Sequence, residues 1–197
     1  MIKRTFDILS SLLAILAFIP IYLLVAILVY YSLGWPIIYK AKRAGKYNKE
    51  FTLIKFRSMK NSTNHVSHHS GDDDPRITKT GKFIRQTKLD ELPQLFNVLF
   101  GKMSIVGPRP ERPELCDEFM KNYPIFAERL ACHQGLTGLA QLIGKYDTAP
   151  KNKLRYDLLY IKNKSIFLDL KIVFLSVLVT IIGNWQSDSR KWVKKFF

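Results

Sequence analysis

Residues 8–33 read ILSSLLAILAFIPIYLLVAILVYYSL, an uncharged apolar run that decides how the N-terminal part of this chain folds. As one straight helix these 26 residues would extend roughly 39 Å, more than the ~30 Å hydrocarbon core of a bilayer requires. The run is too long for the core of a signal peptide, and no small-residue cleavage site follows it. We therefore expect the segment to remain in the chain and to contact lipid.

Two topologies are open for this run: one kinked helix that crosses the bilayer, or a helix that enters, bends and returns to the same face. Pro20 lies in the middle of the run and removes a backbone hydrogen bond, so a bend is expected there. Basic residues, which resist translocation, flank both ends of the run, and this favours the returning helix. They are Lys3 and Arg4 before the run, and Lys40, Lys42, Arg43 and Lys46 after it. Asp7, at the mouth of the hairpin, favours a helix N-terminus and a basic neighbour.

The composition describes a basic, folded chain of 197 residues with 31 basic and 16 acidic side chains, a formal net charge of +15. An apolar fraction of 47% excludes a disordered or collagen-like chain, and two cysteines exclude a disulfide-dense secreted scaffold. We expect a membrane hairpin, residues 1–36, followed by a cytosolic domain, residues 37–197, with interfacial amphipathic helices. The surplus of positive charge suits anionic lipid or a phosphorylated substrate; no nucleic-acid motif is present, so no nucleic-acid partner is expected.

After the hairpin the pattern predicts an α+β fold that is mostly helical. Residues 36–40 and 51–57 read as short strands joined by a basic turn, residues 42–49, and so predict a β-hairpin. Helices are expected from about 114 to 132 with a break near Pro124, over 156–160, and over 166–183 as a packed or interfacial helix. The basic tail, residues 190–195, suits anionic lipid.

A polar stretch, residues 61–74, contains residues that could bind a metal: His65, His68, His69 and Asp72 to Asp74. The spacing of these residues is not that of a zinc motif, and the composition predicts a loop. We therefore favour a solvated loop over a metal site.

Residues 87–101 predict a helix that carries two adjacent carboxylates. Thr87 followed by Asp90 is typical of a capping box, Gly101 is a natural stop, and Pro93 belongs in a first turn. This places Asp90 and Glu91 at a helix N-terminus, where such residues cap helices more often than they catalyse reactions.

The surroundings of this pair indicate chemistry on phosphate. Basic residues flank it in nearby segments, and three prolines among residues 108–113 predict a rigid turn that presents Arg109 and Arg112. Carboxylates among cations suit Mg²⁺ bridged to phosphate oxygens, and an aspartate can attack phosphorus. The basic residues are Lys55, Arg57, Lys82, Arg85, Arg109 and Arg112. A basic domain on a membrane hairpin implies one water-soluble phosphorylated substrate and one carried by lipid.

Seven segments, in order from Lys3 to Tyr160, resemble those of the monotopic phosphoglycosyl transferases, the bacterial sugar transferase family. The two central segments are long and specific. The segments are KRTFD (3–7), FTLIKFRSM (51–59), DPRIT (74–78), LDELPQLFNV (89–98), MSIVGPRP (103–110), GLTGLAQ (135–141) and DLLY (157–160).

The resemblance implies transfer of a phospho-sugar from a UDP-sugar to polyprenol (undecaprenyl) phosphate, with release of UMP, as the first membrane step of bacterial glycoconjugate or polysaccharide synthesis. Asp90 matches the nucleophile that forms a covalent aspartyl phospho-sugar, and Glu91 matches the acid that holds Mg²⁺. It further implies a re-entrant hairpin broken at Ile19–Pro20 in the inner membrane, a catalytic domain facing the cytoplasm, and a possible homodimer. The expected substrate-binding residues are Lys55, Arg57, Arg85, Pro108, Arg109, Pro110, Lys145 and Asp157.

The chain departs from the family pattern at two places. Gln134 stands where proline is usual before the Gly-x-Thr-Gly loop, so that loop is expected to be less rigid. Ile143 and Lys145 stand where asparagine and arginine are usual in one motif, and the loss of the guanidinium fork is expected to change the contacts to phosphate or sugar. Neither change touches Asp90 or Glu91. The alternative function is a non-enzymatic, basic, membrane-anchored binding protein.

Overall fold

The computed structural model describes residues 2–60, 74–144, 150–182, 185, 193 and 195–197. It is mostly helical with two small sheets, which confirms the expected composition of the fold. The helices are α1 (Ile2–Ala17), α2 (Ile19–Leu33), α3 (Lys79–Gln86), α4 (Gln94–Leu99), α5 (Pro113–Asn122), α6 (Phe126–Arg129), α7 (Leu139–Ile143), α8 (Pro150–Asn163) and α9 (Ile166–Ile182). The strands are β1 (Ile38–Ala44), β2 (Glu50–Phe56), β3 (Ser104–Val106) and β4 (Gly135–Thr137).

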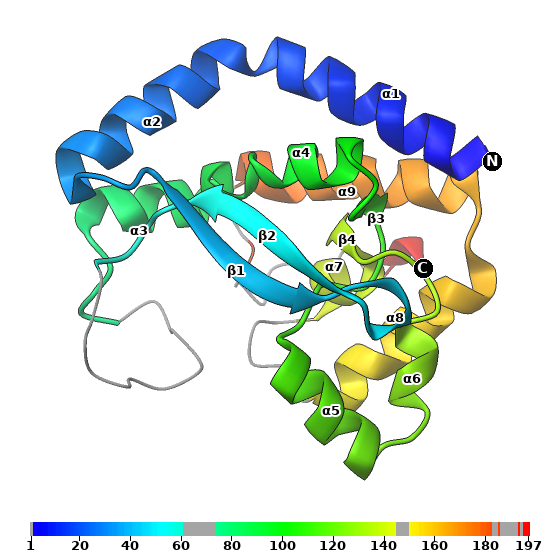
Figure 1. The fold of residues 1–197 in the computed structure, drawn as a ribbon. Coiled ribbons are helices and arrows are strands. Elements are labelled where there is room, and N and C mark those ends of the chain that lie inside the picture. The colour runs from blue at the N-terminus through cyan, green and yellow to red at the C-terminus, as the bar shows by residue number, and fades with distance from the viewer. Residues whose placement is uncertain (1, 61–73, 145–149, 183–184, 186–192, 194) are drawn as a thin grey trace.

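Helices α1 and α2 form an arch over the rest of the molecule (Figure 1). The two helices are bent by 64° at Phe18, and Pro20 lies in the first turn of α2, where its missing N–H costs little. The expected bend at Pro20 is therefore confirmed. Within the described residues no single helix combines the length and apolar composition needed to cross a bilayer; the bent pair meets both criteria only when its two helices are counted together.

The N-terminal end of the arch is attached to the domain by the charged residues that precede the apolar run. The buried carboxylate of Asp7 accepts hydrogen bonds from the Ser104 hydroxyl at 3.0 Å and the Ile105 N–H at 2.9 Å. Arg4 donates to two carbonyls at the C-terminal end of α4, at 2.7 and 2.8 Å. Asp7 thus binds the start of β3, and not the basic neighbour expected from the sequence.

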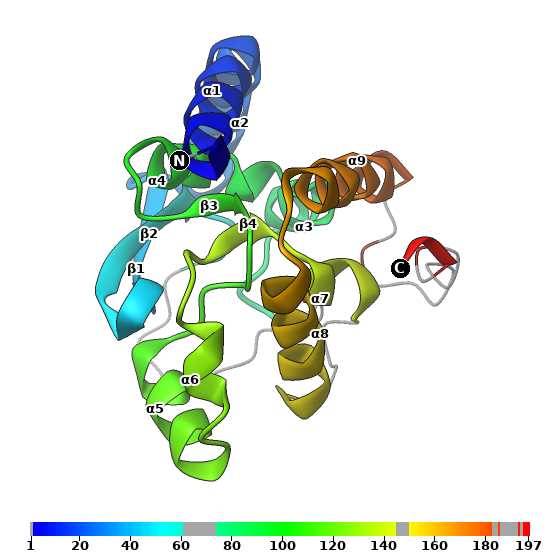
Figure 2. The ribbon, with the colours of Figure 1, turned by 90° about the vertical axis from the view of Figure 1, so that its right-hand side faces the viewer.

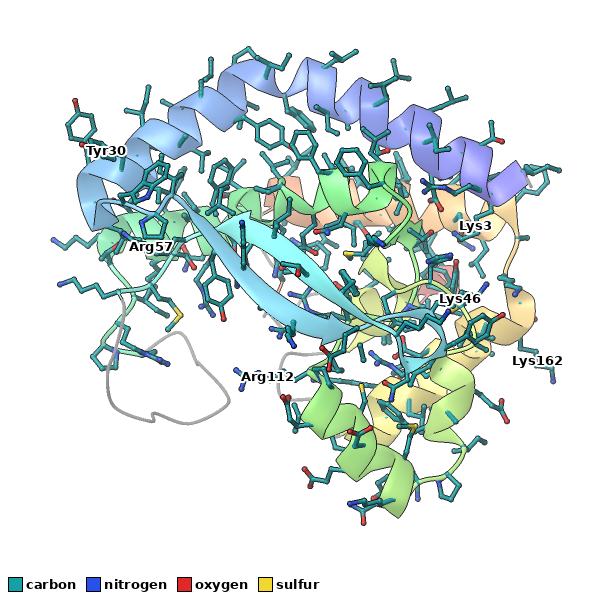
Figure 3. All side chains as sticks on the ribbon, viewed as in Figure 1. Lys3, Tyr30, Lys46, Arg57, Arg112 and Lys162 are labelled. Atoms are coloured by element: carbon teal, nitrogen blue, oxygen red, sulfur yellow. The ribbon has the colours of Figure 1, made fainter. Side chains whose placement is uncertain are left out.

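Lys3 makes a further attachment to α9. Its ammonium lies 2.6 Å from a carboxylate oxygen of Asp169, which is buried (Figure 3). The Tyr160 hydroxyl donates to the other Asp169 oxygen at 2.7 Å, so the buried charge is satisfied from two sides.

The C-terminal end of the arch is attached to the same body. Arg57, at the end of the β-hairpin, is only 6% exposed and lies beneath the end of α2 (Figure 3). Its guanidinium donates to the carbonyls of Leu33, Gly34 and Trp35, which would otherwise lack partners at the helix end. Both ends of the arch therefore contact one folded unit.

The predicted β-hairpin is confirmed, with strands that extend further into the turn than expected. Strands β1 and β2 are antiparallel, and Tyr39 lies opposite Lys55. The Asn97 side chain of α4 accepts from the Ile54 N–H at 3.1 Å and donates to the Thr52 carbonyl at 2.8 Å, which fastens the hairpin to α4. The other sheet is a parallel pair, β3 and β4.

The elements form layers below the arch. Helix α4 lies directly beneath it and α9 lies to one side of it, whereas α5, α6 and α8 lie at the opposite end of the molecule, as two perpendicular views agree (Figures 1 and 2). The main core lies between these layers and includes the buried side chains of Met103, Val106, Leu142, Tyr160 and Ile172.

The predicted capping box at Thr87 is wrong. Thr87 is the C-terminal cap of α3, and its hydroxyl donates back to the Phe83 carbonyl at 2.8 Å. Lys88 then adopts a left-handed conformation with φ of 59°, so the chain turns before the carboxylates. The Thr-x-x-Asp spacing of a capping box is present, but the Thr87 hydroxyl bonds to a carbonyl of the preceding helix and does not cap the following one.

The remaining helical predictions hold with shifted boundaries. The segment 114–132 forms α5 and α6 with the break at Pro124, residues 156–160 fall within α8, and α9 covers residues 166–182 of the predicted 166–183, the last of which lies outside the described residues. The predictions for the loop at 61–73, for Lys145 and for most of the basic tail lie outside the described residues.

Candidate active site

Asp90 and Glu91 lie on a single 3₁₀ turn, η2 (Leu89–Glu91), between α3 and α4. The sequence placed them in the first turn of one long helix; the structure instead inserts this separate turn, and α4 begins after Pro93. Asp90 is 4% exposed. One of its oxygens, Oδ1, is buried without a hydrogen-bond partner among the described residues. A buried carboxylate oxygen left without a partner is costly, and such groups are typical of reactive or ligand-binding positions.

Three cations from separate segments surround the pair. Arg109, from the turn after β3, places Nη2 at 2.7 Å from Glu91 Oε1. Lys55, from β2, places Nζ at 3.9 Å from Asp90 Oδ2, and Lys88 places Nζ at 4.0 Å from Glu91 Oε1. The structure therefore brings Lys55 and Arg109 beside the acidic pair, and their expected role in substrate binding stays a prediction.

The environment moves the pKa values of the two carboxyls in opposite directions. Burial, together with the charge of Glu91, raises the pKa of Asp90 to about 6, against the attraction of Lys55 and Lys88. Burial alone would raise the pKa of Glu91 as well, but Arg109 and the two lysines lower it. Burial lowers the pKa of Lys55, although the two carboxylates oppose the shift. Two adjacent carboxyl groups whose pKa values are shifted in opposite directions suit two different roles in one reaction.

The two carboxylates are suited to bind Mg²⁺ jointly with a substrate. Mg²⁺ is commonly held by one or two carboxylates together with phosphate oxygens. Among the residues that the structure describes, Asp90 Oδ1 has no hydrogen-bond partner and Glu91 Oε2 has a long contact of 3.4 Å to Arg109, so both carboxylates retain an oxygen with spare acceptor capacity. Among the described residues no three acidic, histidine or cysteine side chains form a metal-binding group. Phosphate oxygens of a substrate, together with water, would complete the coordination.

The Arg109 turn is held rigidly by close contact between glycines. A side chain on Gly135 would place Cβ 2.1 Å from the Gly107 nitrogen, and one on Gly138 would place Cβ 2.2 Å from the Gly107 oxygen. The Gly135 N–H also donates to the Pro108 carbonyl at 2.8 Å. Both prolines of the turn, Pro108 and Pro110, are buried, whereas Arg109 is exposed, so the turn presents Arg109 as predicted.

Three of the remaining predicted residues lie in different surroundings. Arg85 contacts the Met59 sulfur at 3.3 Å and is near enough to Asp90 to lower its pKa. Arg57 does not join the acidic pair, because its guanidinium is bonded to the carbonyls at the end of α2. Asp157 is 2% exposed and forms a buried ion pair with Arg129 at 2.6 Å, beneath the Arg109 turn. Direct substrate contacts by Arg57 and Asp157 stay untested predictions.

Sequence reasoning missed four residues near the site. Gln141 accepts from Arg109 at 3.2 Å, Tyr39 places its ring 5.5 Å from the Lys55 ammonium, and Lys88 and Arg129 make the ion pairs given above. Lys88 could have been found from its position two residues before Asp90. Arg129 offered no signal, because a single arginine in a helical segment resembles an ordinary surface residue.

The chain is similar in sequence to known proteins over most of its length. A family model described as "Bacterial sugar transferase" matches residues 1–183. The chain is 40% identical over 186 residues to a "UDP-N-acetylgalactosamine-undecaprenyl-phosphate N-acetylgalactosaminephosphotransferase" of Aeromonas hydrophila, covering 92% of this chain and 44% of that protein. It is 42% identical over 188 residues to a "UDP-glucose:undecaprenyl-phosphate glucose-1-phosphate transferase" of Klebsiella pneumoniae, covering 92% of this chain and 40% of that protein.

A shorter relative is matched over most of its length. The "Exopolysaccharide production protein ExoY" of Sinorhizobium fredii is 37% identical over 194 residues, covering 89% of this chain and 83% of that protein. The chain thus spans less than half of the first two relatives and most of the third.

Proposed function

Because this chain belongs to the bacterial sugar transferase family, we propose that it transfers a sugar phosphate from a UDP-sugar to polyprenol phosphate and releases UMP. The observation that carries the proposal is the buried Asp90 with an unpartnered oxygen, set beside a Glu91 that Arg109 holds. Relatives whose names specify transfer of a sugar phosphate to undecaprenyl phosphate support the substrate classes.

We propose that the first half-reaction forms a covalent intermediate on Asp90. The carboxylate attacks the β-phosphorus of the donor, a new oxygen–phosphorus bond forms, and the bond from that phosphorus to the bridging oxygen breaks. UMP leaves with the bridging oxygen, and the sugar phosphate stays on Asp90. Lys55, Lys88 and Arg109 lie where their positive charges would stabilise the phosphoryl oxygens as charge develops.

The second half-reaction frees Asp90. A phosphate oxygen of polyprenol phosphate attacks the same phosphorus, the Asp90–phosphorus bond breaks, and polyprenol diphosphate sugar is released. We propose that Glu91, together with its neighbour Asp90 on the same turn, would hold Mg²⁺. Bound Mg²⁺ would neutralise charge on the phosphate oxygens and favour departure of UMP. Glu91 itself keeps Arg109 at the site through their 2.7 Å ion pair.

We propose that the N-terminal hairpin, residues 1–36, which contains the arch, dips into the cytoplasmic leaflet of the inner membrane and returns to the same face. Both of its ends contact the same domain, and its outer face exposes large apolar side chains such as Leu13, Leu23 and Tyr31. Helix α9 exposes a second apolar face that includes Phe167 and Phe174. These faces, together with the net charge of +15, suit an anionic membrane surface.

The proposed function is tested by incubating the purified full chain, in bilayer nanodiscs, with undecaprenyl phosphate, Mg²⁺ and a panel of UDP-sugars. We expect UMP release with at least one donor, and loss of release when EDTA is added. Donor alone should add the mass of a sugar phosphate to the protein. A non-enzymatic basic binder would bind the nanodiscs and release no UMP with any donor, which would overturn the proposal.

Replacing Pro20 with alanine is expected to straighten the arch and allow part of the population to cross the membrane. Proline costs little in the first turn of α2, but in a continuous helix position 20 would be interior, where alanine is ~3 kcal/mol more favourable than proline. The measurement is labelling of a cysteine at position 2 by a membrane-impermeant maleimide, in a background in which Cys116 and Cys132 are alanine. Labelling from the outside should appear only in the Pro20→Ala variant.

The matched control for this experiment is a cysteine at Lys162, an exposed position in α8. It should be labelled from the cytoplasmic side in both backgrounds, because it lies on α8, far from the arch (Figure 3). If position 2 is still reached only from the cytoplasmic side in the Pro20→Ala variant, then Pro20 does not set the topology.

A further inference from the structure

An ion pair lies buried beneath the Arg109 turn. Arg129, the last residue of α6, is 3% exposed, and its Nε lies 2.6 Å from Oδ2 of Asp157 in α8, which is 2% exposed. The guanidinium also lies 5.2 Å from the Phe126 ring. Removing two charges from water is expensive, and a buried pair of this kind is weak evidence for a contribution to stability.

The pair is also incompletely satisfied. Arg129 Nη1 is buried with no hydrogen-bond partner in the described part of the chain. A buried donor without a partner costs free energy, so an apolar pair of similar volume would fill this space at lower cost. The residues at these positions are therefore better explained by what the guanidinium contacts than by the stability it provides.

The second contact of the guanidinium is with the functional turn. Arg129 Nη2 donates a hydrogen bond to the backbone carbonyl of Arg109. On the other side of the same residue, the Arg109 guanidinium lies 2.7 Å from Glu91. One chain of contacts therefore runs from Asp157 through Arg129 and the Arg109 backbone to the acidic pair.

We propose that Arg129, oriented by Asp157, is a positioning residue that sets the place of Arg109 beside Glu91. The glycine contacts hold the turn at Gly107 and Pro108, and Arg129 holds it at the following residue. A guanidinium suits this role because its planar fork can bond a carboxylate and a carbonyl at the same time. The proposal deepens the proposed function and rests on it for its kinetic test alone.

The first test measures the turn without any substrate. The double variant Arg129→Met, Asp157→Leu removes both buried charges, and the carboxylate of Glu111, 4.0 Å from Arg129, is partly exposed to solvent, so the variant should fold. Hydrogen–deuterium exchange of the purified protein should be at least about tenfold faster in the backbone amides of residues 107–112 than in the wild type. Unchanged exchange in that segment would overturn the proposal, whether or not the protein has activity.

The matched control is Ile172→Ala, which opens a cavity in the core at α9, where Ile172 is fully buried. It should lower the denaturant midpoint of unfolding without selectively increasing exchange in residues 107–112. Equal acceleration in both variants would show that Arg129 only stabilises the domain, and would also overturn the proposal.

The kinetic test is a double-mutant cycle with Arg109→Gln, using the donor that gives the most UMP in the panel. If Arg129 acts through Arg109, the double variant Arg129→Met, Asp157→Leu should lower kcat at least about tenfold when Arg109 is present. It should lower kcat less than about twofold once Arg109 is glutamine. Arg129→Lys, which retains a donor, should recover part of the loss. If the substitutions at Arg129 and Asp157 lower kcat by the same factor with and without Arg109, the proposal is overturned. If no donor releases UMP with the wild type, the proposed function fails, and the exchange measurement alone decides on Arg129.

Discussion

The Asp90→Asn variant is expected to lose UMP release by about 10³-fold or more and to show no mass increase when incubated with donor alone. An amide has no charged oxygen to attack phosphorus, so the covalent half-reaction cannot begin. Mass spectrometry of the intact protein after donor addition measures the intermediate directly. The control is Asp117→Asn, an exposed residue of α5, which should retain both activities. Normal turnover by Asp90→Asn would remove the proposed mechanism.

The same substitution is expected to stabilise the protein above pH 6. Burial and the neighbouring charge of Glu91 raise the pKa of Asp90 from 3.8 in the unfolded chain to about 6. Ionised Asp90 is therefore destabilising in the folded state, and this cost is absent below pH 3.8 and complete above about pH 6. A pKa shift of that size corresponds to a loss of ~3 kcal/mol in the free energy of unfolding. This is an upper value, because Asp90 and Glu91 titrate as a coupled pair.

Chemical unfolding of both proteins at pH 5 and pH 8 measures this effect. The stability of the wild type should fall relative to that of Asp90→Asn as the pH rises between these values. If the two unfolding free energies differ by the same amount at both pH values, then Asp90 ionises without cost and its environment is not the one described. Loss of activity together with gained stability is the signature of a strained functional group.

The Glu91→Gln variant is expected to weaken the Mg²⁺ dependence and to move the acid limb of the pH–rate profile to lower pH. The amide keeps the shape of the side chain but removes a charged ligand, so the Mg²⁺ concentration for half-maximal rate should rise about tenfold or more. The charge of Glu91 is among the causes that raise the pKa of Asp90. Its removal should therefore lower that pKa from about 6 towards the ordinary value of 3.8.

Initial rates across pH 4.5–8, each at saturating Mg²⁺, separate these two effects. Glu50→Gln is the matched control, because Glu50 lies at the exposed start of β2 and pairs with Lys42 at 3.2 Å. It should leave the Mg²⁺ titration and the acid limb unchanged. An unaltered Mg²⁺ titration in Glu91→Gln would exclude Glu91 as a ligand, and an acid limb that moves to higher pH would contradict the assigned coupling to Asp90.

Local patterns predicted most of the elements of this fold. Pro20 predicted the bend because proline lacks the N–H that a continuous helix needs, and the apolar repeats predicted the long helices. The capping box failed at Thr87, because a hydroxyl can bond either forward to a new helix or back to the preceding one. Spacing alone does not distinguish these two partners.

The acidic pair was recognisable from the sequence, but its neighbours were only partly so. Arg109 lies 18 residues from Glu91 along the chain, and nothing local brings the two together. Their contact depends on the parallel pairing of β3 with β4 and on the glycine contacts beside Gly107. These are long-range features, and a single sequence does not display them.

The amino-acid sequence by itself determined the apolar arch with its break, the basic character of the domain, and the Asp90–Glu91 pair among cations. Only the tertiary structure decided which charged side chains reach that pair. Arg57 instead bonds to the carbonyls at the end of α2, and Asp157 lies against Arg129 beneath the turn. The physical reason is that a buried charge must be paired where packing leaves it, and packing depends on segments far apart in the chain.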